Sequence, residues 1–399
     1  MPAREAATSR PAPGTHTLFL DGDCLVFSAP RQEVHVLNSS AGVVWCALED
    51  GLSPTEVSDV LAERFGLAPD AARAGLAAAL AALRSYALLD GGAAPPVAAA
   101  PAPAAPAGLP PLGTPHFVAD TQYALLGTRF RLRCTDTAVL GWVDPVLRHL
   151  ATPPGAVDIV LALVGSATAG RYVLYQDNLP VGECSAVNGA APLVKGAIWS
   201  SAVNRFDFLI GIHAGVVGGA DGGVMLLPGR PGRGKSTLTA KLLRAGGRYF
   251  SDEMALFGTT DLRITPLPLP LCVKAEGRAA LAEDYPDLAT LPLHLRADGR
   301  RVAYLPPPPA SLPAPGTSAP LRAIVFPHFR PGEASRLSPL RKAEALRRLM
   351  AECMVKRRPL ELGHMRSLLG LMQQTACYDF SFATSAEALR LLRPILNLG

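Results

Sequence analysis

Residues 223–253 read GVMLLPGRPGRGKSTLTAKLLRAGGRYFSDE, and this stretch decides the fold of the larger part of the chain. Within it, GRPGRGKS at residues 229–236 satisfies the pattern G-x-x-x-x-G-K-[ST], in which a glycine-rich loop surrounds phosphate oxygens. The apolar run before the loop predicts a strand over residues 223–227. The residues after it predict a helix over residues 236–245 that ends at a pair of glycines. Strand, loop and helix together indicate an α/β domain with a phosphate site.

The residue types in this loop suit a nucleotide. Glycines let backbone amides approach phosphate oxygens, and the start of the helix adds partial positive charge. Lys235 can neutralise the β- and γ-phosphates of ATP, and the Ser236 hydroxyl can bind Mg²⁺. The residues expected to contact the nucleotide are Gly229, Arg230, Pro231, Gly232, Arg233, Gly234, Lys235, Ser236 and Thr237.

Two consecutive carboxylates follow the loop, at a distance along the sequence that is expected to place them beside it in the folded domain. Asp252 lies 16 residues after Ser236, an interval that one helix and one short strand fill. Asp252 and Glu253 are therefore expected at the carboxyl edge of the sheet, beside the phosphates. A positioned carboxylate helps a hydroxyl lose its proton when that hydroxyl attacks phosphorus. The sequence has no clean example of an apolar strand ending in Asp, the usual partner in larger P-loop proteins.

Residues 205–260 resemble the HPr kinase/phosphorylase family, whose ATP site is like that of PEP carboxykinase. The matching blocks are IHAGVV at 212–217, GVMLLPGRPGRGKSTL at 223–238 and AGGRYFSDE at 245–253. The resemblance is weaker on both sides of this core. It implies a kinase that uses Mg-ATP to phosphorylate a hydroxyl of a protein or peptide.

The same resemblance assigns roles to individual residues. Asp252 would accept the hydroxyl proton, His213 would support that transfer, and Lys235 would act at the phosphates. Ser236 and Glu253 would hold Mg²⁺, although Glu253 stands where these kinases have a second Asp. The phosphorylase signature of the family is not recognisable in this sequence, so reversal of the reaction by phosphate is not expected.

Residues 16–90 carry a different pattern. Three short β-rich runs, HTLFL, CLVFSA and EVHVL, precede three stretches with helical spacing. Asn38 or Ser39 is expected to cap the first helix, and Ser53 with Glu56 has the spacing of a capping box for the second. Three strands followed by three helices predict a small winged-helix domain.

This block resembles the PqqD family, whose members are peptide chaperones, or recognition elements, of ribosomal-peptide modification systems. Its marks are LNSSAGVVWCALEDGLSPTEVSDVLAERFG at 37–66 and LAAALAALRSYALLDG at 76–91. The resemblance implies that the leader of a precursor peptide adds as a strand beside Glu33–Leu37. It would pack against the third helix, expected from Pro69 to Leu89, over the part between Ala74 and Tyr86. Such β-augmentation binds a peptide through its backbone and selects it through side-chain pockets.

Charge and composition exclude several classes of function. Residues 1–90 carry a net charge of −5 and the remainder carries +10, so the winged helix is not expected to bind nucleic acid. No apolar run is long enough to cross a membrane, and the N-terminus has no secretory signal. The seven cysteines are scattered without metal-ligand or redox spacing, which indicates reduced thiols in a cytoplasmic protein.

The prolines divide the chain. Residues 91–115 hold no charge and repeat Pro and Ala, which predicts an extended linker. We therefore expect an α+β multidomain protein: a disordered N-terminus (1–15), a PqqD-like winged helix (16–90), the Pro/Ala linker, and an α/β P-loop kinase domain of the HPr kinase/PEP carboxykinase type (116–399). A second proline-rich stretch at 305–320 is expected to be a loop within the kinase domain.

A basic segment stands apart from these motifs. Residues 330–358 hold nine basic and three acidic residues and predict an amphipathic helix opened by Ser338 and Pro339. Its basic face is either solvated or reaches the phosphates or an acidic substrate. The candidates for that contact are Arg341, Arg347 and Arg348, with Lys274 as a further candidate elsewhere.

These patterns combine into one functional hypothesis. The chain would capture a ribosomally made precursor peptide by its leader and phosphorylate a Ser or Thr hydroxyl with ATP and Mg²⁺. Three alternatives stay open: an ATP-binding chaperone without catalysis, a kinase whose phosphate is transient and leads to dehydration or cyclisation, and a small-molecule kinase. The peptide, the acceptor residue and a homo-oligomeric state are not encoded in recognisable signals.

Overall fold

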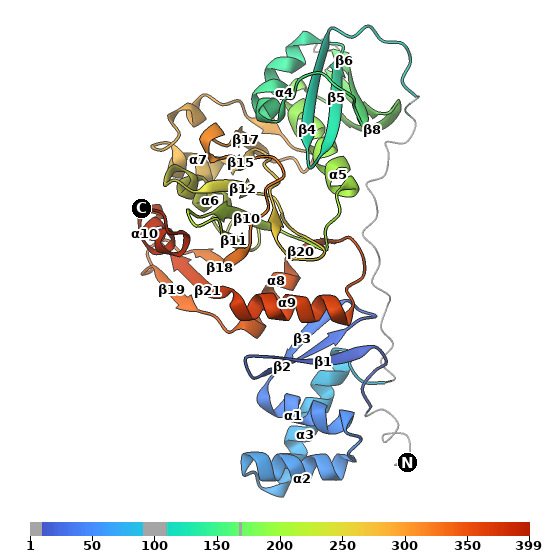
Figure 1. Ribbon diagram of the computed structural model, residues 1–399, viewed down its shortest axis with the longest axis vertical. Coiled ribbons are helices and arrows are strands. Elements are labelled where there is room, and N and C mark those ends of the chain that lie inside the picture. The colour runs from blue at the N-terminus through green and yellow to red at the C-terminus, as the bar shows by residue number, and fades with distance from the viewer. Residues whose placement is uncertain (1–9, 91–108, 110, 167–169) are drawn as a thin grey trace. The chain divides into compact units, whose positions relative to one another are not determined.

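The computed structural model describes residues 10–90, 109, 111–166 and 170–399 (Figure 1). The chain packs as two units, one formed by residues 1–100 with 339–377 and the other by 101–338 with 378–399. Most of the predicted disordered N-terminus (1–15) and of the predicted linker (91–115) lies outside the described residues. Both units mix helices and strands.

The first unit begins with an antiparallel sheet followed by three helices, as the sequence predicts. The strands lie in the order β1-β2-β3, so β3 is at one edge of the sheet. The elements are β1 (Thr15–Leu20), β2 (Asp23–Ser28), β3 (Glu33–Leu37), α1 (Ser39–Glu49), α2 (Pro54–Phe65) and α3 (Pro69–Ser85).

Local signals set the ends of these helices. The side chain of Asn38 accepts a hydrogen bond from the Ala41 amide at 2.8 Å and caps α1. Ser53 and Glu56 form the predicted capping box at the start of α2. The predicted end of the third helix at Leu89 is wrong: α3 ends at Ser85, and Ala87 adopts a left-handed backbone that no α-helix continues through.

Helix α1 packs on β2 and β3, and α2 and α3 complete the apolar core on that side of the sheet. Trp45, Val57, Leu61 and Leu83 are almost completely buried and pack with Val26 of β2. Burial of such side chains contributes about 1.5–3 kcal/mol each. This apolar core gives residues 16–90 a hydrophobic centre of their own.

The opposite face of the same sheet is covered by a segment from far along the chain. Leu25 and Phe27 alternate with Cys24 and Val26 along β2, so they point away from α1–α3, yet both are fully buried. Helix α8 packs against β3, and α9 packs against β1 (Figure 1). This segment contains α8 (Lys342–Ala351), β20 (Cys353–Lys356) and α9 (Leu362–Gln374).

Polar contacts fix this segment to the sheet. The Gln32 side chain donates to the Leu360 carbonyl at 3.0 Å and accepts from the Leu360 amide at 2.6 Å. Lys356 donates to the Gln32 carbonyl at 2.8 Å. The predicted helix start at Ser338 and Pro339 is wrong, because both residues belong to strand β19 and the helix begins at Lys342.

The second unit opens with a five-stranded sheet in the order β4-β5-β6-β7-β8, which α4 and α5 accompany. Helix α5 packs against β4, β5, β7 and β8. The elements are β4 (Ala119–Leu125), β5 (Thr128–Cys134), η2 (Thr137–Val139), α4 (Leu140–Leu147), η3 (Arg148–Leu150), β6 (Ile159–Ser166), β7 (Arg171–Gln176), β8 (Leu179–Cys184), η4 (Val187–Gly189) and α5 (Ala190–Arg205).

A six-stranded sheet in the order β12-β10-β11-β18-β21-β19 forms the centre of this unit. Strand β10 is antiparallel to both β11 and β12, and β18 is parallel to β11, so β11, β12 and β18 end at the same edge. Helix α6 packs on β10. The elements are β10 (Ala214–Gly218), β11 (Val224–Pro228), α6 (Lys235–Arg244), β12 (Arg248–Ser251), β18 (Leu321–Phe329), β19 (Arg336–Pro339), β21 (Ala376–Phe382), α10 (Ser385–Leu392) and η7 (Arg393–Leu396).

Shorter strands complete the unit. Strand β13 pairs with β9 and β14, and β17 pairs with β15 and β16. The proline-rich stretch 305–320 connects β17 to β18 as a loop, as predicted. No helix among the described residues is long and apolar enough to cross a membrane. The elements are β9 (Ile210–Ile212), β13 (Ala255–Phe257), β14 (Ile264–Thr265), β15 (Leu271–Lys274), α7 (Ala275–Leu281), η5 (Pro286–Ala289), β16 (His294–Leu295), β17 (Arg301–Leu305) and η6 (Pro309–Ser311).

Candidate functional site

The glycine-rich motif forms the predicted strand, loop and helix. Strand β11 ends at Pro228, and α6 begins at Lys235. Gly229, Gly232 and Gly234 all have positive φ, at 143°, 90° and 88°, which side chains rarely allow. A Cβ on Gly234 would lie only 2.7 Å from Cζ of Phe382. The loop therefore depends on glycine both for its turn and for its close approach to β21.

Lys235 points into this loop. Its side chain is buried, with 6% of the residue exposed, and Nζ donates to the carbonyl oxygens of Gly229 and Arg230. The loop tip, including Arg230, Pro231, Gly232 and Arg233, is exposed, and Ser236 and Thr237 are half-buried. The nine residues predicted to contact a nucleotide thus form one continuous loop and the start of α6. The buried ammonium group of Lys235 points into this loop.

Asp252 is the second component of the site. It directly follows β12, and its residue is 9% exposed. Oδ2 accepts a hydrogen bond from the Cys272 amide at 3.3 Å, whereas Oδ1 is buried without a hydrogen-bond partner among the described residues. Burial raises the pKa of Asp252 to about 7, against the opposing influence of the Ser236 side chain, the Cys272 amide and Lys235. Asp252 is thus close enough to Ser236 and Lys235 for both side chains to influence its pKa.

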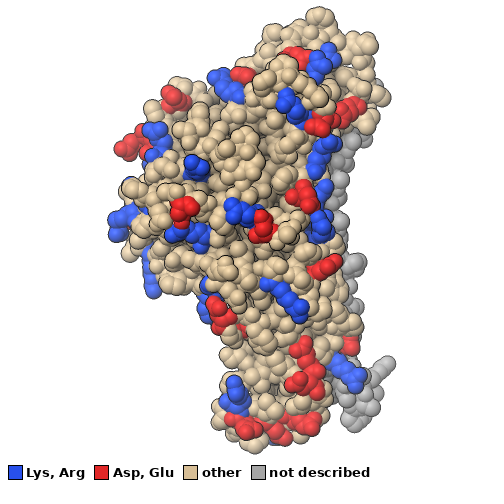
Figure 2. Space-filling view, in the orientation of Figure 1, with Lys and Arg blue, Asp and Glu red and all other residues tan. Residues whose placement is uncertain are grey.

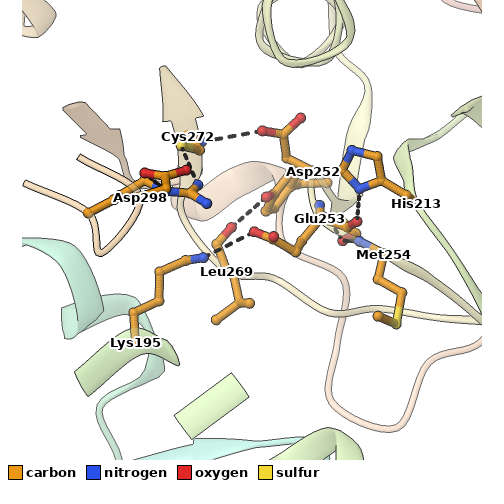
Figure 3. Close-up of polar contacts among 11 residues, drawn as sticks. Lys195, His213, Asp252, Glu253, Met254, Leu269, Cys272 and Asp298 are labelled. Carbon is orange, nitrogen blue, oxygen red and sulfur yellow. Dashed lines mark hydrogen bonds and ion pairs between the residues drawn. The ribbon is translucent and has the colours of Figure 1, made fainter. Parts of the chain in front are cut away.

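Glu253 faces a different partner. Figure 3 shows its carboxylate directed at Lys195 of α5, with Oε2 3.1 Å from Nζ. Burial acts to raise the pKa of Glu253, but Lys195, then Arg296 and His213, hold it below its ordinary value. Glu253 is therefore an ionised carboxylate held in an ion pair, and its predicted role as a metal ligand stays a prediction.

His213 lies between β9 and β10, next to the two carboxylates. Its Nδ1 is 3.0 Å from the backbone oxygen of Glu253 (Figure 3). This contact ties the imidazole to the turn that carries Asp252 and Glu253. The structure thus brings Lys235, Asp252 and His213, the three predicted catalytic residues, to one edge of the central sheet.

Sequence reasoning missed Lys195 and Arg296. Arg296 donates from Nη1 to Cys272 Sγ at 3.7 Å and lies 3.4 Å from Asp298. Lys195 lies in the apolar first part of α5, and its side chain is 10% exposed. The sequence signal that could have identified Lys195 was a lysine within an apolar helical stretch, because a buried ammonium group needs a carboxylate partner.

One residue of the loop, Arg233, is tied to the neighbouring strands. Arg233 Nη1 is 2.6 Å from Nδ1 of His328 on β18, and His328 Nε2 is 3.2 Å from Oδ1 of Asp379 on β21. These contacts link the exposed tip of the loop to the ends of two strands beside it.

The other predicted cations have separate surroundings. Arg341 pairs with Asp23 at 2.7 Å, and Arg347 and Arg348 both pair with Glu344 at 2.7 Å. These pairs support the solvated interpretation of the basic helix. Lys274 directly precedes α7, whose Gly277 lies against the Thr237 side chain of the loop. Its predicted contact with a ligand stays a prediction.

The first unit offers an open strand at the predicted peptide-binding position. Strand β3 forms the edge of its sheet, and α3 ends beside it. The His35 ring of β3 stacks on Tyr86, with ring centroids 4.8 Å apart, and Tyr86 is 43% exposed. Burial lowers the pKa of His35, which favours its neutral form. The two predicted segments, Glu33–Leu37 and residues 74–86, therefore meet at an aromatic pair.

Comparison with known proteins addresses this unit directly. Residues 23–89 match the family described as Coenzyme PQQ synthesis protein D (PqqD). These residues form a PqqD domain. The match covers all of β2 to α3 in the PqqD domain and excludes the phosphate-loop region. The comparison with curated proteins finds no similar sequence.

One of the solved structures similar to this chain aligns with a short part of it. It is titled "TbiB1 in Complex with the TbiA(beta) Leader Peptide", with 20% sequence identity and a TM-score of 0.20. The alignment covers 21% of this chain and 99% of that chain.

The face of the PqqD domain drawn in Figure 2 is acidic. On the face drawn in Figure 2, Asp and Glu side chains gather over α2 and its surroundings, where Glu56, Asp59, Glu63 and Asp70 are exposed. Phosphate contacts require Lys and Arg, so this surface does not suit the backbone of a nucleic acid.

Proposed function

We propose that this chain is a kinase that uses ATP and Mg²⁺ to phosphorylate a Ser or Thr hydroxyl of a precursor peptide captured by its PqqD domain. The observation that carries the proposal is the carboxylate of Asp252, which is buried at the sheet edge that also carries the glycine-rich loop. Its Oδ1 has no hydrogen-bond partner among the described residues. A buried polar atom without a partner is costly, and a binding group at that position removes the cost.

The residues at this edge fit a triphosphate and a divalent cation. The loop amides and Lys235 would hold the phosphates, and the Ser236 hydroxyl offers a hard oxygen ligand of the kind that Mg²⁺ takes. The cation would supply charge neutralisation at the transferred phosphate. Glu253 could join them only after its ion pair with Lys195 opens.

Asp252 is suited to act as the base. The oxygen of the peptide hydroxyl attacks the γ-phosphorus, the bond from that phosphorus to the bridging oxygen of ADP breaks, and Asp252 accepts the hydroxyl proton. A carboxylate with its pKa raised to about 7 accepts a proton more readily than an ordinary aspartate. Most of the rate gain would come from alignment and charge neutralisation, since phosphoryl transfer involves little other chemistry.

His213 and Lys195 would position the two carboxylates. His213 contacts the backbone of Glu253, and Lys195 holds the Glu253 side chain away from Asp252. Two adjacent carboxylates repel each other unless one is neutralised, so Lys195 limits how far Glu253 raises the pKa of Asp252.

The PqqD domain supports the choice of a peptide substrate. The resemblance to this family implies capture of a leader. One edge of β3 pairs with no strand among the described residues and so offers backbone groups to an added strand. Binding of the leader would raise the local concentration of the acceptor hydroxyl, to the millimolar range for a short flexible connection. We place the reaction in the cytoplasm, where ATP is available and where the seven free cysteines stay reduced.

The test measures transfer and binding separately. The purified chain is incubated with ATP, Mg²⁺ and the precursor peptide encoded beside its gene, and phosphopeptide is quantified by mass spectrometry. Asp252→Asn should abolish phosphoryl transfer and retain ATP binding by calorimetry. Full transfer by this variant would show that Asp252 is not the base. ATP binding without phosphopeptide in the parent protein would favour a non-catalytic chaperone, and a dehydrated product would favour a transient phosphate.

A further inference from the structure

The ring of Phe329 is an exposed aromatic surface beside the glycine-rich loop. Phe329 ends strand β18 and is 49% exposed, whereas Phe326 of the same strand is 5% exposed. Its ring lies against Phe382, with centroids 5.4 Å apart, and Phe382 stacks on Phe380 at 5.2 Å. An exposed phenyl ring on a rigid aromatic base is costly in water and well suited to stacking.

This aromatic group is in direct contact with the phosphate loop. The Cβ position of Gly234 is 2.7 Å from Phe382 Cζ and 3.7 Å from Cβ of Phe329. The neighbouring Arg233 lies 2.6 Å from His328, the residue before Phe329. The Cβ atom of Phe329 is therefore held within a few ångströms of the loop that would hold the phosphates.

The order of the strands determines which part of a nucleotide reaches Phe329. Strands β11, β12 and β18 point the same way, and they lie in the order β12-β10-β11-β18 (Figure 1). Asp252 follows β12 on one side of the loop, and Phe329 ends β18 on the other side. If the γ-phosphate faces Asp252, the ribose and base must leave the loop toward β18.

We propose that Phe329 stacks on the base of the bound nucleotide and makes this a site for purine nucleoside triphosphates. This inference rests on the proposed function, because it assumes that the loop binds a triphosphate with its γ-phosphate toward Asp252. The strength of stacking on a phenyl ring depends on the area of the base and not on its hydrogen-bonding groups. ATP and GTP should therefore bind with similar affinity and CTP more weakly.

Calorimetry with ATP and with inorganic tripolyphosphate tests the inference, because the second ligand has the phosphates without the base. In the full chain with Mg²⁺, Phe329→Ala should weaken ATP binding about tenfold and leave tripolyphosphate binding unchanged. Phe329→Trp should keep the affinity for ATP. The matched control is Phe65→Ala, since Phe65 is also exposed, at 40%, and lies at the end of α2.

The outcomes separate the two proposals. Unchanged ATP binding in Phe329→Ala would overturn the role of Phe329 and leave the kinase proposal intact. Equal loss of ATP and tripolyphosphate would also overturn it, because Phe329 would then act only by supporting the loop. Failure of the parent chain to bind either ligand would contradict the proposed function itself, and the inference with it.

Discussion

Asp252 and Glu253 are consecutive residues with opposite tendencies to ionise. Burial raises the pKa of Asp252 to about 7, whereas Lys195 holds the pKa of Glu253 below its ordinary value. Their side chains face different partners, since Asp252 accepts from Cys272 and Glu253 pairs with Lys195 (Figure 3). One carboxyl group can therefore exchange a proton near neutral pH while its neighbour stays charged.

The raised pKa of Asp252 predicts a pH-dependent stability. In the unfolded chain the same carboxyl group has a pKa near 3.8, so the folded chain holds this proton more tightly. The parent protein should lose stability as pH rises from about 4 to about 7, by a total on the order of 4 kcal/mol. Asp252→Asn removes this loss. Its melting temperature should equal the parent's near pH 4 and exceed it at pH 8. A difference that does not change with pH would contradict the buried, protonated state.

The ion pair between Lys195 and Glu253 predicts a strong effect of removing one partner. Lys195→Met should destabilise the protein by about 3 kcal/mol, because it leaves a largely buried carboxylate without its cation and raises the pKa of Glu253. The double variant Lys195→Met with Glu253→Gln should recover most of this loss in chemical denaturation. If the double variant is as unstable as the sum of the single variants, the two side chains do not interact.

The contact between Gly234 and Phe382 predicts a specific cost for an added methyl group. Gly234→Ala should destabilise the protein more than Gly222→Ala, by about 1–3 kcal/mol, and should weaken ATP binding. Both glycines have positive φ, at 88° and 81°, but only the Cβ at residue 234 meets a ring. Adding Phe382→Leu should restore part of the stability lost in Gly234→Ala. Equal melting temperatures for the two single variants would argue against the close contact.

The aromatic pair beside β3 predicts the effect of a substitution on peptide capture. Tyr86→Ala should weaken binding of the leader about tenfold, because a strand added beside β3 would bury this exposed ring. Fluorescence anisotropy with the labelled leader of the neighbouring precursor measures the affinity. Phe65→Ala serves as the control and should bind like the parent. Equal affinities for Tyr86→Ala and the parent would place the leader elsewhere.

Features determined by neighbouring residues were predictable from the sequence. Asn38 caps α1 by accepting a hydrogen bond from the amide of Ala41. Ser53 and Glu56, three positions apart, form the capping box of α2. The glycine-rich loop forms as predicted because positive φ is a property of the glycines themselves. The approach of Asp252 to the loop was also predictable, since one helix and one strand leave a short chain little freedom.

Features that depend on distant residues were not predictable. Lys195 and Glu253 are separated by 58 positions, and no periodicity connects them. The packing of α8 and α9 on the first sheet pairs residues more than 300 positions apart, as in the contact of Gln32 with Leu360. The basic residues of α8 were candidates for a ligand contact, but Glu344 within the same helix pairs with both Arg347 and Arg348. Such pairs become visible only when side-chain positions are known.

The most direct test of the account is the intact mass of the precursor peptide after incubation with the chain, ATP and Mg²⁺. We expect the mass to rise by one phosphoryl group, and we expect the leaderless peptide to react at least about tenfold more slowly at the same concentration. Full precursor that stays unmodified, in a sample where ATP binding is demonstrated, would contradict the account.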